Sequence, residues 1–484
     1  MTFRRFVGDT LGLAASQYAA RAVLLARGVV SAVALGPAGF GAWNALNLIL
    51  DYGTFASGGV LQGLDLRLPG PTVRGEAREA RRLLAGAWSV VLLGGGLYAL
   101  LVVGTLATGH PALLRGLGWG PPLLMLGAAL LQLVIQYQGS ALRARGRFGA
   151  VSGSAAAQAL LGGGLGMVLV VRYGIPGLLW GWLAGTLVAV AWVRRAAPDV
   201  PLRPGACPDG IRMAKGGFVV FAAFLVSLFL RSVDRMAFIA FGEAEHLGSY
   251  GLGLMAAGLV LYLPEAAAAV LYPRIVAAAD GALDPEVVRA QILRAHRVLT
   301  LLLPPVVAVA MVWVGPVLER WLPQYRDAIG AVRLLALGAL LLSASTLPGY
   351  WLLGSGRGRA LLVSGLAAAA VTAGLVFGVA SRAPLPTPVA AAACVGYGLF
   401  AAAIVAAAAP GLLPGRGGLR AFAVASFLPS LWAVAAVFVA CSWGPEASLR
   451  AAALRTVAVA LACAPLLWHL RRRLGLDLGL GSAS

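Results

Sequence analysis

Six arginines lie inside long apolar runs of this sequence, where an ion is expensive to place. They are Arg21, Arg27, Arg231, Arg235, Arg333 and Arg455. The last two could reach an aqueous interface by extending their side chains. We expect the first four to point inward and to bind an anion, because a guanidinium group presents paired N–H donors that match the oxygens of a phosphate.

Polar residues also mark the stretch from Asn44 to Asp65. An aspartate inside a lipid-spanning helix costs about 2.5 to 3.5 kcal/mol on insertion scales, so Asp51 needs a polar surrounding. At about 100° per residue, the polar side chains share one narrow face of a helix that we expect to line a water-filled cavity. They could instead bond to neighbouring helices and only hold a bundle together. These residues are Asn44, Asn47, Asp51, Thr54, Gly58, Gln62 and Asp65, and a later run repeats the pattern with Gln132, Gln136, Ser140 and Arg143.

Two further carboxylates accompany the arginines. Arg231, Asp234 and Arg235 stand at i, i+3 and i+4. In one continuous helix they would share a face that stays positive even if Asp234 pairs with Arg231. Glu265 could titrate with a coupling proton or neutralise an arginine, and we expect the pairing.

Oxygen-bearing side chains allow a different interpretation of the same region. Asn44, Asp51 and Asp234 could coordinate a sodium ion if their oxygens converged from several helices. The spacing of these residues along the chain leaves that question open.

The elements that must position these residues are transmembrane helices. The chain has 484 residues, of which 60% are hydrophobic and 12% charged, values typical of a membrane protein. Crossing a bilayer takes about 20 residues. Fourteen such runs lie at 9–34, 41–63, 83–107, 121–141, 151–171, 174–193, 217–240, 249–272, 298–317, 331–354, 360–381, 387–409, 420–441 and 450–470. We therefore predict an all-α polytopic membrane protein.

The net charge of +20 gives the orientation of these helices. Of the 38 Lys and Arg residues, 26 fall in one set of alternate loops and the two tails, and six in the opposite loops. This asymmetry predicts that both termini are cytoplasmic, by the positive-inside rule. The basic charge is therefore explained without a nucleic-acid partner.

A polar stretch rich in Pro and Gly at 196–216 divides the helices into two lobes. We predict an N-terminal lobe of six helices at 1–195, a cytoplasmic linker at 196–216, a C-terminal lobe of six helices at 217–409, and two additional helices with a tail at 410–484. In a further inside segment, Asp284, Pro285 and Glu286 form a helix start, and we expect an interfacial amphipathic helix there.

Two short segments indicate that the lobes are repeats. LGPAGFGAW (Leu35–Trp43) and FGEAEHLGSY (Phe241–Tyr250) each enter a run, six runs apart. With one inserted residue, Gly36, Phe40, Gly41 and Trp43 match Gly242, Leu247, Gly248 and Tyr250. A parallel duplication with a pseudo-twofold axis and a cavity between the lobes is a transporter plan.

Several chemistries lack a signature in this sequence. The phosphate-binding loop G-x-x-x-x-G-K-[ST] is missing, and His, Cys and carboxylate residues do not cluster at metal-ligand spacing. The four cysteines are scattered, so packing is their expected role. We expect no cofactor and no enzyme activity, with energy from an ion gradient, the substrate's own gradient or a partner.

The chain resembles the polysaccharide flippases, the O-antigen-type family of the multidrug/oligosaccharidyl-lipid/polysaccharide (MOP) exporter superfamily. The resemblance rests on LGPAGFGAW followed by LILDYG, on VDRMAF followed by LGSYGLGLM and LPEAAAAVLYPRI, and on LPQYRDAI. It extends from the N-terminus to about residue 355, and the last four helices match only in hydropathy.

The resemblance implies that the protein carries an undecaprenyl-pyrophosphate-linked oligosaccharide across the bacterial inner membrane during lipopolysaccharide or other surface polysaccharide synthesis. It also implies coupling to a proton or sodium gradient, with Arg21, Arg27, Arg231 and Arg235 as cavity cations. The expected partners are the lipid-linked substrate, membrane lipids and other polysaccharide-assembly membrane proteins.

Three alternatives remain. A lipid II flippase of peptidoglycan synthesis handles the same class of substrate. A multidrug antiporter of the same superfamily would be expected to have carboxylates and aromatics in place of arginines. A polysaccharide polymerase or ligase usually has a large outer loop, whereas the longest outer segment here, Pro316 to Ala328, has about 13 residues.

Overall fold

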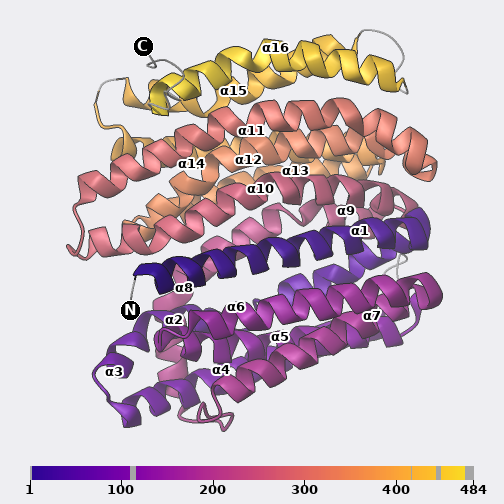
Figure 1. Cartoon of the computed structure of the whole chain (residues 1–484). Coiled ribbons are helices and arrows are strands. Elements are labelled where there is room, and N and C mark those ends of the chain that lie inside the picture. The colour runs from indigo at the N-terminus through magenta and orange to yellow at the C-terminus, as the bar shows by residue number, and fades with distance from the viewer. Residues whose placement is uncertain (1–2, 110–115, 416, 443–447, 475–484) are drawn as a thin grey trace. The chain divides into compact units, whose positions relative to one another are not determined.

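The computed structural model describes residues 3–109, 116–415, 417–442 and 448–474, and within these ranges the side chains of residues 20–469. All regular structure in these residues is helical (Figure 1). Twelve segments are long and apolar enough to cross a membrane, and two of them each join two helices at a kink. The predicted all-α fold with about fourteen membrane-crossing helices is confirmed for the described part of the chain.

The chain forms two compact units. The first unit comprises Met1–Leu228 and Phe238–Gly248, and the second comprises Phe229–Ala237 and Ser249–Ser484. The chain passes from the first unit to the second within the seventh predicted run. Helix α8 begins at Cys207, which lies inside the predicted linker at 196–216. The helices up to this point are α1 Phe3–Gly53, α2 Val60–Arg67, α3 Pro69–Val73, α4 Ala77–Thr108, α5 Gly120–Ala144, α6 Phe148–Ala157, the π-helix η2 Gln158–Gly162, α7 Gly163–Ala196 and α8 Cys207–Leu230.

The remaining helices, which follow the break after α8, lie mainly in the second unit. Two crossings in this unit, α12 and α14, are the most deeply buried of the candidate spans. In the apolar stretch of each, 67% and 61% of the residues are buried. The elements are α9 Val233–Phe241, α10 Ala244–Ala279, α11 Pro285–Trp321, the 3-10 helix η3 Pro323–Tyr325, α12 Ala328–Gly354, α13 Gly358–Ala380, α14 Pro386–Leu412, α15 Gly418–Cys441 and α16 Leu449–Leu474.

Glycines produce the two kinks inside α1 and α7. Gly36 has φ 65° and Gly174 has φ 59°, both in the left-handed region that a residue without Cβ adopts readily. A proline follows closely in each case, Pro37 or Pro176. Proline fits the first turn of a helix, where its missing N–H is not needed. Each Gly and Pro pair therefore ends one crossing and begins the next.

Facing glycines join the fifth and sixth crossings. Gly162 and Gly166 on one segment lie against Gly181 and Gly185 on the other, and a Cβ at Gly181 or Gly185 would overlap backbone atoms of the facing segment. Because lipid is as apolar as a leucine side chain, helices in a bilayer associate through such close packing. The two small-xxx-small patterns hold this helix pair together.

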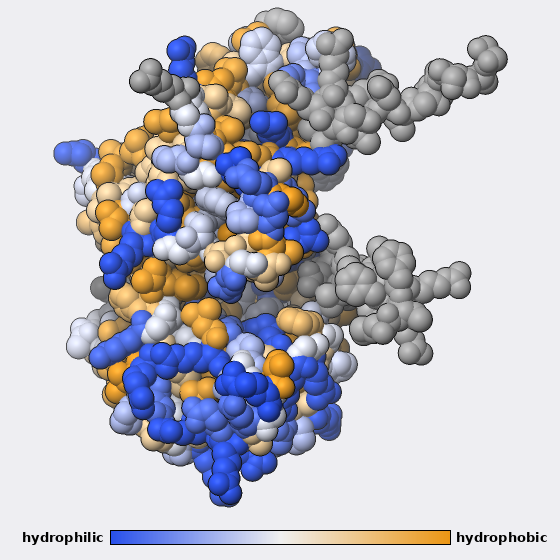
Figure 2. All heavy atoms as spheres, turned by 90° about the vertical axis from the view of Figure 1, so that its left-hand side faces the viewer, coloured by the Kyte–Doolittle hydropathy of each residue, from blue (hydrophilic) through white to orange (hydrophobic). Residues whose placement is uncertain are grey.

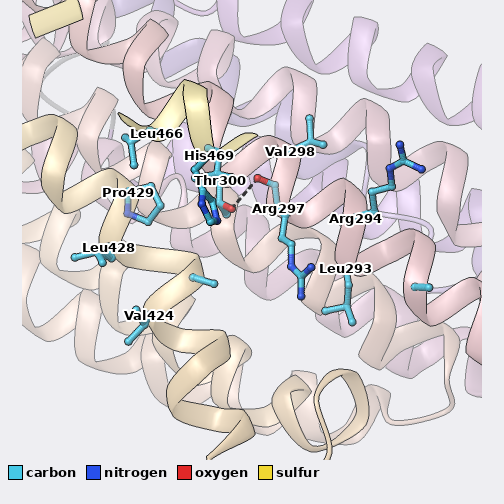
Figure 3. A pocket seen from close by; sticks show the side chains of 13 residues that line it. Leu293, Arg294, Arg297, Val298, Thr300, Val424, Leu428, Pro429, Leu466 and His469 are labelled. Carbon is cyan, nitrogen blue, oxygen red and sulfur yellow. Dashed lines mark hydrogen bonds between the residues drawn. The ribbon is translucent and has the colours of Figure 1, made fainter. Parts of the chain in front are cut away.

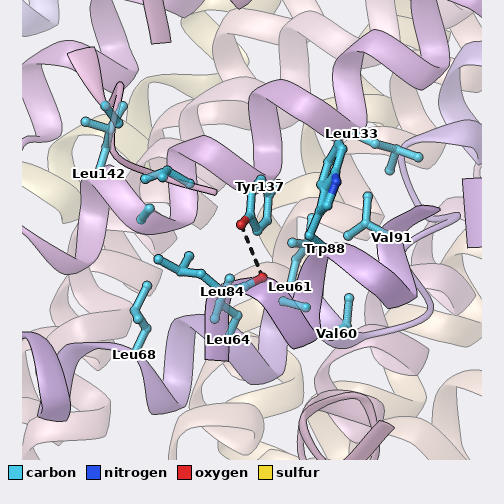
Figure 4. Close-up of a cluster of buried hydrophobic side chains, with 14 of the residues drawn as sticks. Val60, Leu61, Leu64, Leu68, Leu84, Trp88, Val91, Leu133, Tyr137 and Leu142 are labelled. Atoms are coloured by element: carbon cyan, nitrogen blue, oxygen red, sulfur yellow. Dashed lines mark hydrogen bonds between the residues drawn. The ribbon is translucent and has the colours of Figure 1, made fainter. Parts of the chain in front are cut away.

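Buried side chains of the first unit form a hydrophobic cluster around Trp88 and Tyr137, whose ring centroids are 4.9 Å apart (Figure 4). The Tyr137 hydroxyl lies 3.1 Å from the carbonyl oxygen of Leu84 and 2.7 Å from that of Pro201. A buried tyrosine needs such an acceptor for its O–H. Tyr137 therefore fastens the loop after α7 to the helices of the cluster.

The two segments that match as a repeat touch each other within the first unit. A Cβ on Gly41 would overlap the carbonyl oxygen of Ala244, and a Cβ on Gly248 would overlap the carbonyl oxygen of Pro37. The contact is reciprocal, because each matched glycine meets the residue four positions before the other.

Charged side chains gather at one end of the first unit, in the loops that the sequence assigns to the cytoplasm. Figure 2 looks onto this end and shows the hydrophilic side chains in the lower part of the view. Arg145 and Asp199 form a two-bonded ion pair there, at 2.9 and 2.6 Å, and the hydrogen bonds from Arg145 hold the pKa of Asp199 below its usual value. The arginines at positions 4, 5, 115, 416 and 471–473, which also enter the charge count, lie outside the described side chains.

The helix start predicted near residue 284 is confirmed in part. Asp284 caps α11 by accepting a hydrogen bond from the backbone N–H of Glu286 at 2.9 Å, and Pro285 is the first helical residue. The expectation of a separate interfacial helix is wrong, because α11 continues without a break to Trp321. The amphipathic segment is the first part of a long crossing.

We predict that Gly181→Leu lowers the apparent melting temperature of the purified protein, because the new side chain has no space between the two backbones. Overpacking of this kind costs about 1 to 3 kcal/mol, and more where backbone must move. The matched control is Gly164→Leu, since a Cβ at Gly164 meets nothing within 4 Å. Equal melting temperatures for the two variants in the same detergent would contradict the close packing described here.

Candidate functional site

The second crossing is interrupted directly after Asp51. Helix α1 ends at Gly53, residues 54–59 form turns, and α2 begins at Val60. Gly58 and Gly59 have φ of 56° and 86°, a backbone conformation that no regular α-helix contains, so α1 and α2 cannot be one continuous helix. The prediction of one continuous polar face from Asn44 to Asp65 is therefore wrong, because it required an unbroken helix. Only Asn44, Asn47 and Asp51 share the helical part.

The seventh crossing is interrupted between its charged residues. Helix α8 ends at Leu230 and α9 begins at Val233, so that Arg231 and Ser232 form a turn. The predicted common face of Arg231, Asp234 and Arg235 also required a continuous helix, and it is wrong for Arg231. Non-helical backbone at membrane depth is tolerated where protein or a water-filled cavity surrounds it. The first break thus follows Asp51 and the second contains Arg231, and both are candidate site residues of the sequence analysis.

Arg27 occupies an aromatic site in the first unit. Its guanidinium carbon lies 4.8 Å from the centre of the Trp182 ring and 5.6 Å from that of Trp43. Both distances are within the range of cation–π attraction. The Nη1 atom is buried and has no hydrogen-bond partner, and no ion pair to Arg27 is found among the described side chains. Among the described side chains, therefore, the site holds a cation without a neutralising carboxylate.

The other predicted residues of α1 differ in environment. Arg21 is exposed, and Asn44, Asn47 and Asp51 are half-buried. The amide nitrogen of Asn44 donates to the Phe40 carbonyl at 2.8 Å, and that of Asn47 donates to the Trp43 carbonyl at 2.9 Å. These bonds run along their own helix, and no hydrogen bond from either amide nitrogen to another helix is found among the described residues.

Gln132 belongs to a small network between helices. The side-chain nitrogen of Gln158, in the π-helix η2, donates to the Gln132 side-chain oxygen at 3.0 Å and to the Thr186 hydroxyl at 2.9 Å. Gln136, one turn further along α5, is half-buried. For Gln132, this bonding matches the alternative in which polar groups hold the bundle together. Gln158 and Thr186 complete the network, and the sequence interpretation had not selected them.

Arg231 and Glu265 form the charged pair of the second unit. Arg231 Nη1 donates to Glu265 Oε1 at 2.8 Å, and the two side chains are 38% and 44% exposed. Glu265 is therefore bonded to an arginine, and the partner of Arg231 is Glu265 instead of Asp234. Because both members are partly exposed, an anion that approaches this pair could compete with Glu265 for the guanidinium group.

Asp234 lies fully buried in the second unit and is held by donors of several elements. One of its oxygens accepts the backbone N–H of Arg235 at 2.7 Å. The other accepts the hydroxyl of Tyr250 at 2.5 Å and lies 3.5 Å from that of Tyr397. Arg235 itself is half-buried. The two tyrosines come from α10 and α14, so the carboxylate links three helices.

The sequence analysis did not identify the aromatic residues that contact Arg27 and Asp234, although the repeat pattern marks two of them. Trp43 and Tyr250 are matched positions of the repeat, and each contacts a charged residue sixteen positions earlier, Arg27 or Asp234. Trp182 and Tyr397 lie in other helices and have no comparable signal. Within the described residues, no group of His, Cys, Asp and Glu is arranged to hold a metal ion.

No family model and no curated protein sequence matches the chain. Several solved structures match the chain. The lipid II flippase MurJ in an inward closed conformation superposes with a TM-score of 0.71 at 12% identity, over 96% of this chain and 99% of that one. An inward-facing multidrug resistance MATE family transporter of the MOP superfamily gives 0.61 at 18%, over 83% and 94%. A mutant of the Vibrio cholerae MATE transporter VcmN gives 0.57 at 16%, over 85% and 99%. The chain thus has the fold of the MurJ flippase and of these MATE transporters.

Proposed function

We propose that the protein carries an undecaprenyl-pyrophosphate-linked oligosaccharide across the bacterial inner membrane for surface polysaccharide synthesis, by alternating access. The observation that carries this proposal is the Arg27 site. A cation is held there at membrane depth by two tryptophans, and no carboxylate of the described residues forms an ion pair with it. Such a site can accept an anionic group from a substrate.

The chemistry of the site favours a phosphate. The guanidinium group carries five N–H donors in a plane, and an Arg–phosphate contact can use two of them at once. A buried donor without a partner costs about 1 to 3 kcal/mol, and an arriving phosphate oxygen would remove this cost at Nη1. Arg21, which lies earlier on α1 and is exposed, is proposed as a second cation for the same pyrophosphate.

The second unit would act differently, because its arginines are accompanied by acids. Arg231 is bonded to Glu265, and Arg235 follows Asp234, whose carboxylate accepts its backbone N–H. We propose that Arg231 exchanges Glu265 for a substrate phosphate during the cycle. Glu265 would then be free to take up a proton, which links substrate binding to a proton gradient.

Sodium coupling finds less support at Asp234. Its oxygens already accept a backbone N–H and a tyrosine O–H, so a sodium ion would have to displace these donors. Asp51 lies beside a helix break, where backbone oxygens can also serve as ligands. If sodium is the coupling ion, Asp51 is the better supported residue of the two.

A lipid II flippase of peptidoglycan synthesis is the second candidate, and one observation favours it over a multidrug antiporter. The MurJ structure covers 96% of the chain, and the part left over is shorter than the 24 and 26 residues of α15 and α16. The match therefore extends into the additional helices, whereas the MATE transporter covers 83%. Lipid II also presents a pyrophosphate, so the Arg27 site suits either substrate.

The proposed orientation follows the arginine distribution, with both termini in the cytoplasm. The basic loops of the first unit would then face the compartment in which lipid-linked sugars are made. Further partners of the proposed function are other membrane proteins of polysaccharide assembly.

We predict that Arg27→Ala reduces transport of the lipid-linked oligosaccharide at least tenfold, because a charged hydrogen bond to the substrate is worth about 1.5 to 3 kcal/mol. Arg27→Lys keeps the charge and should retain part of the activity. Arg172→Ala is the matched control, since Arg172 is an exposed arginine of the same unit beside Tyr173. The measurement is complementation of a flippase-deficient strain, with membrane levels of each variant compared. Normal export by Arg27→Ala would contradict the proposal that the Arg27 site binds the substrate.

We predict a distinct outcome for the charged pair of the second unit. Arg231→Gln and Glu265→Gln should each lower the melting temperature, because each leaves a partner unpaired, and the double variant should melt closer to wild type. Transport should remain lost in the double variant if Arg231 binds phosphate. Full recovery of transport in the double variant would instead show that the pair serves only to hold the turn at Arg231 against α10.

A further inference from the structure

A groove on the second unit is separate from the residues considered so far. It is formed by the first half of α11 together with α15 and the end of α16, and its volume is about 890 Å³ (Figure 3). None of the arginines proposed for transport lines it. The groove is lined by Ala290, Leu293, Arg294, Arg297, Val298, Thr300, Leu301, Val424, Ala425, Leu428, Pro429, Leu466 and His469.

Two arginines mark one side of the groove. Arg294 and Arg297 are one turn apart on α11, and both side chains are exposed. Neither forms an ion pair with a carboxylate of the described residues, unlike Arg289 on the same helix, which is paired with Glu286. His469 of α16 also lines the groove (Figure 3). The site therefore offers uncompensated positive charge.

The rest of the groove is apolar and open to the surroundings of the helices. Val424 and Leu428 of α15 are 48% and 55% exposed, values expected for side chains that face lipid chains in a membrane protein. An occupant must therefore combine an anionic group for the arginines with hydrocarbon for the groove. A soluble anion has only the first of these, and a neutral lipid has only the second.

We propose that this groove binds a resident anionic glycerophospholipid, with its phosphate at Arg294 and Arg297 and its acyl chains along α15 and α16. The arginines lie near the start of α11, at the end that the charge distribution assigns to the cytoplasmic leaflet, where anionic lipids attract basic side chains. Basic pockets between transmembrane helices on this side are suited to phospholipid head groups. The lipid would fasten α15 and α16 to α11.

The experiment uses the full-length purified protein and native mass spectrometry to measure the Kd of phosphatidylglycerol. Arg294→Gln combined with Arg297→Gln should weaken binding about thirtyfold, which corresponds to about 1 kcal/mol per arginine. The matched control is Arg357→Gln combined with Arg359→Gln, which removes two exposed arginines of the same unit outside the groove. The control should bind as the wild type does.

A second pair of variants tests the apolar part while all charges remain. Ala425→Trp fills the groove and should also abolish retention of phosphatidylglycerol, whereas Leu431→Trp, at an exposed position of the same helix outside the groove, should not. Phosphatidylcholine with the same acyl chains should bind at least tenfold more weakly than phosphatidylglycerol to the wild type.

Three results would overturn the proposal. They are equal binding of phosphatidylcholine and phosphatidylglycerol, equal losses in the groove and control variants, and displacement of phosphatidylglycerol by undecaprenyl pyrophosphate at equal concentration. The last result would make the groove part of the substrate path. Since the assay measures lipid binding and not transport, its outcome is independent of the proposed function.

Discussion

The structure depends on one constraint, that every backbone N–H and C=O at membrane depth needs a partner within the protein. A helix satisfies this requirement by itself, so a break in a crossing must be bonded in another way. In residues 54–59 a series of turn bonds does so, among them Thr54 N–H to the Leu50 carbonyl at 3.2 Å and Gly58 N–H to the Phe55 carbonyl at 3.1 Å. At the second break, Ser232 N–H bonds to the Phe229 carbonyl at 3.1 Å. The chain thus keeps two irregular segments in the bilayer, and each adjoins an ionisable side chain, Asp51 or Arg231.

The energies of insertion and of cation–π contact explain how Arg27 can remain charged although no described carboxylate pairs with it. Placing an arginine at the centre of a crossing costs about 2.5 to 3.5 kcal/mol on insertion scales. A desolvated cation–π contact returns up to about 2 kcal/mol, and Arg27 has two tryptophan rings within 6 Å. The aromatic contacts therefore offset most of the insertion cost, and they do so without occupying the N–H donors. A carboxylate would have neutralised the charge and used those donors, as Glu265 does for Arg231.

The sequence predicted the helices well because a crossing needs only length and hydropathy. It predicted the cap at Asp284 for a similarly local reason. It failed at the two breaks, since the face arguments assumed a helix that Gly58, Gly59 and the turn at Arg231 interrupt. The glycine pair was a visible signal, but a glycine pair in an apolar run is equally compatible with helix packing. The partners of charged groups, such as Glu265 for Arg231 or Trp182 for Arg27, come from distant helices and cannot be obtained from spacing.

The matched aromatic positions Trp43 and Tyr250 contact residues of opposite charge. Trp43 and Tyr250 occupy the same place in the repeated segments, and each contacts the charged residue sixteen positions before it. In the first unit that residue is a cation, which the face of an indole ring stabilises. In the second it is an anion, which a ring face would repel but a phenolic O–H can bond. The change from tryptophan to tyrosine follows the change of charge from Arg27 to Asp234. The matched aromatic side chain thus contacts a cation in the first unit and an anion in the second.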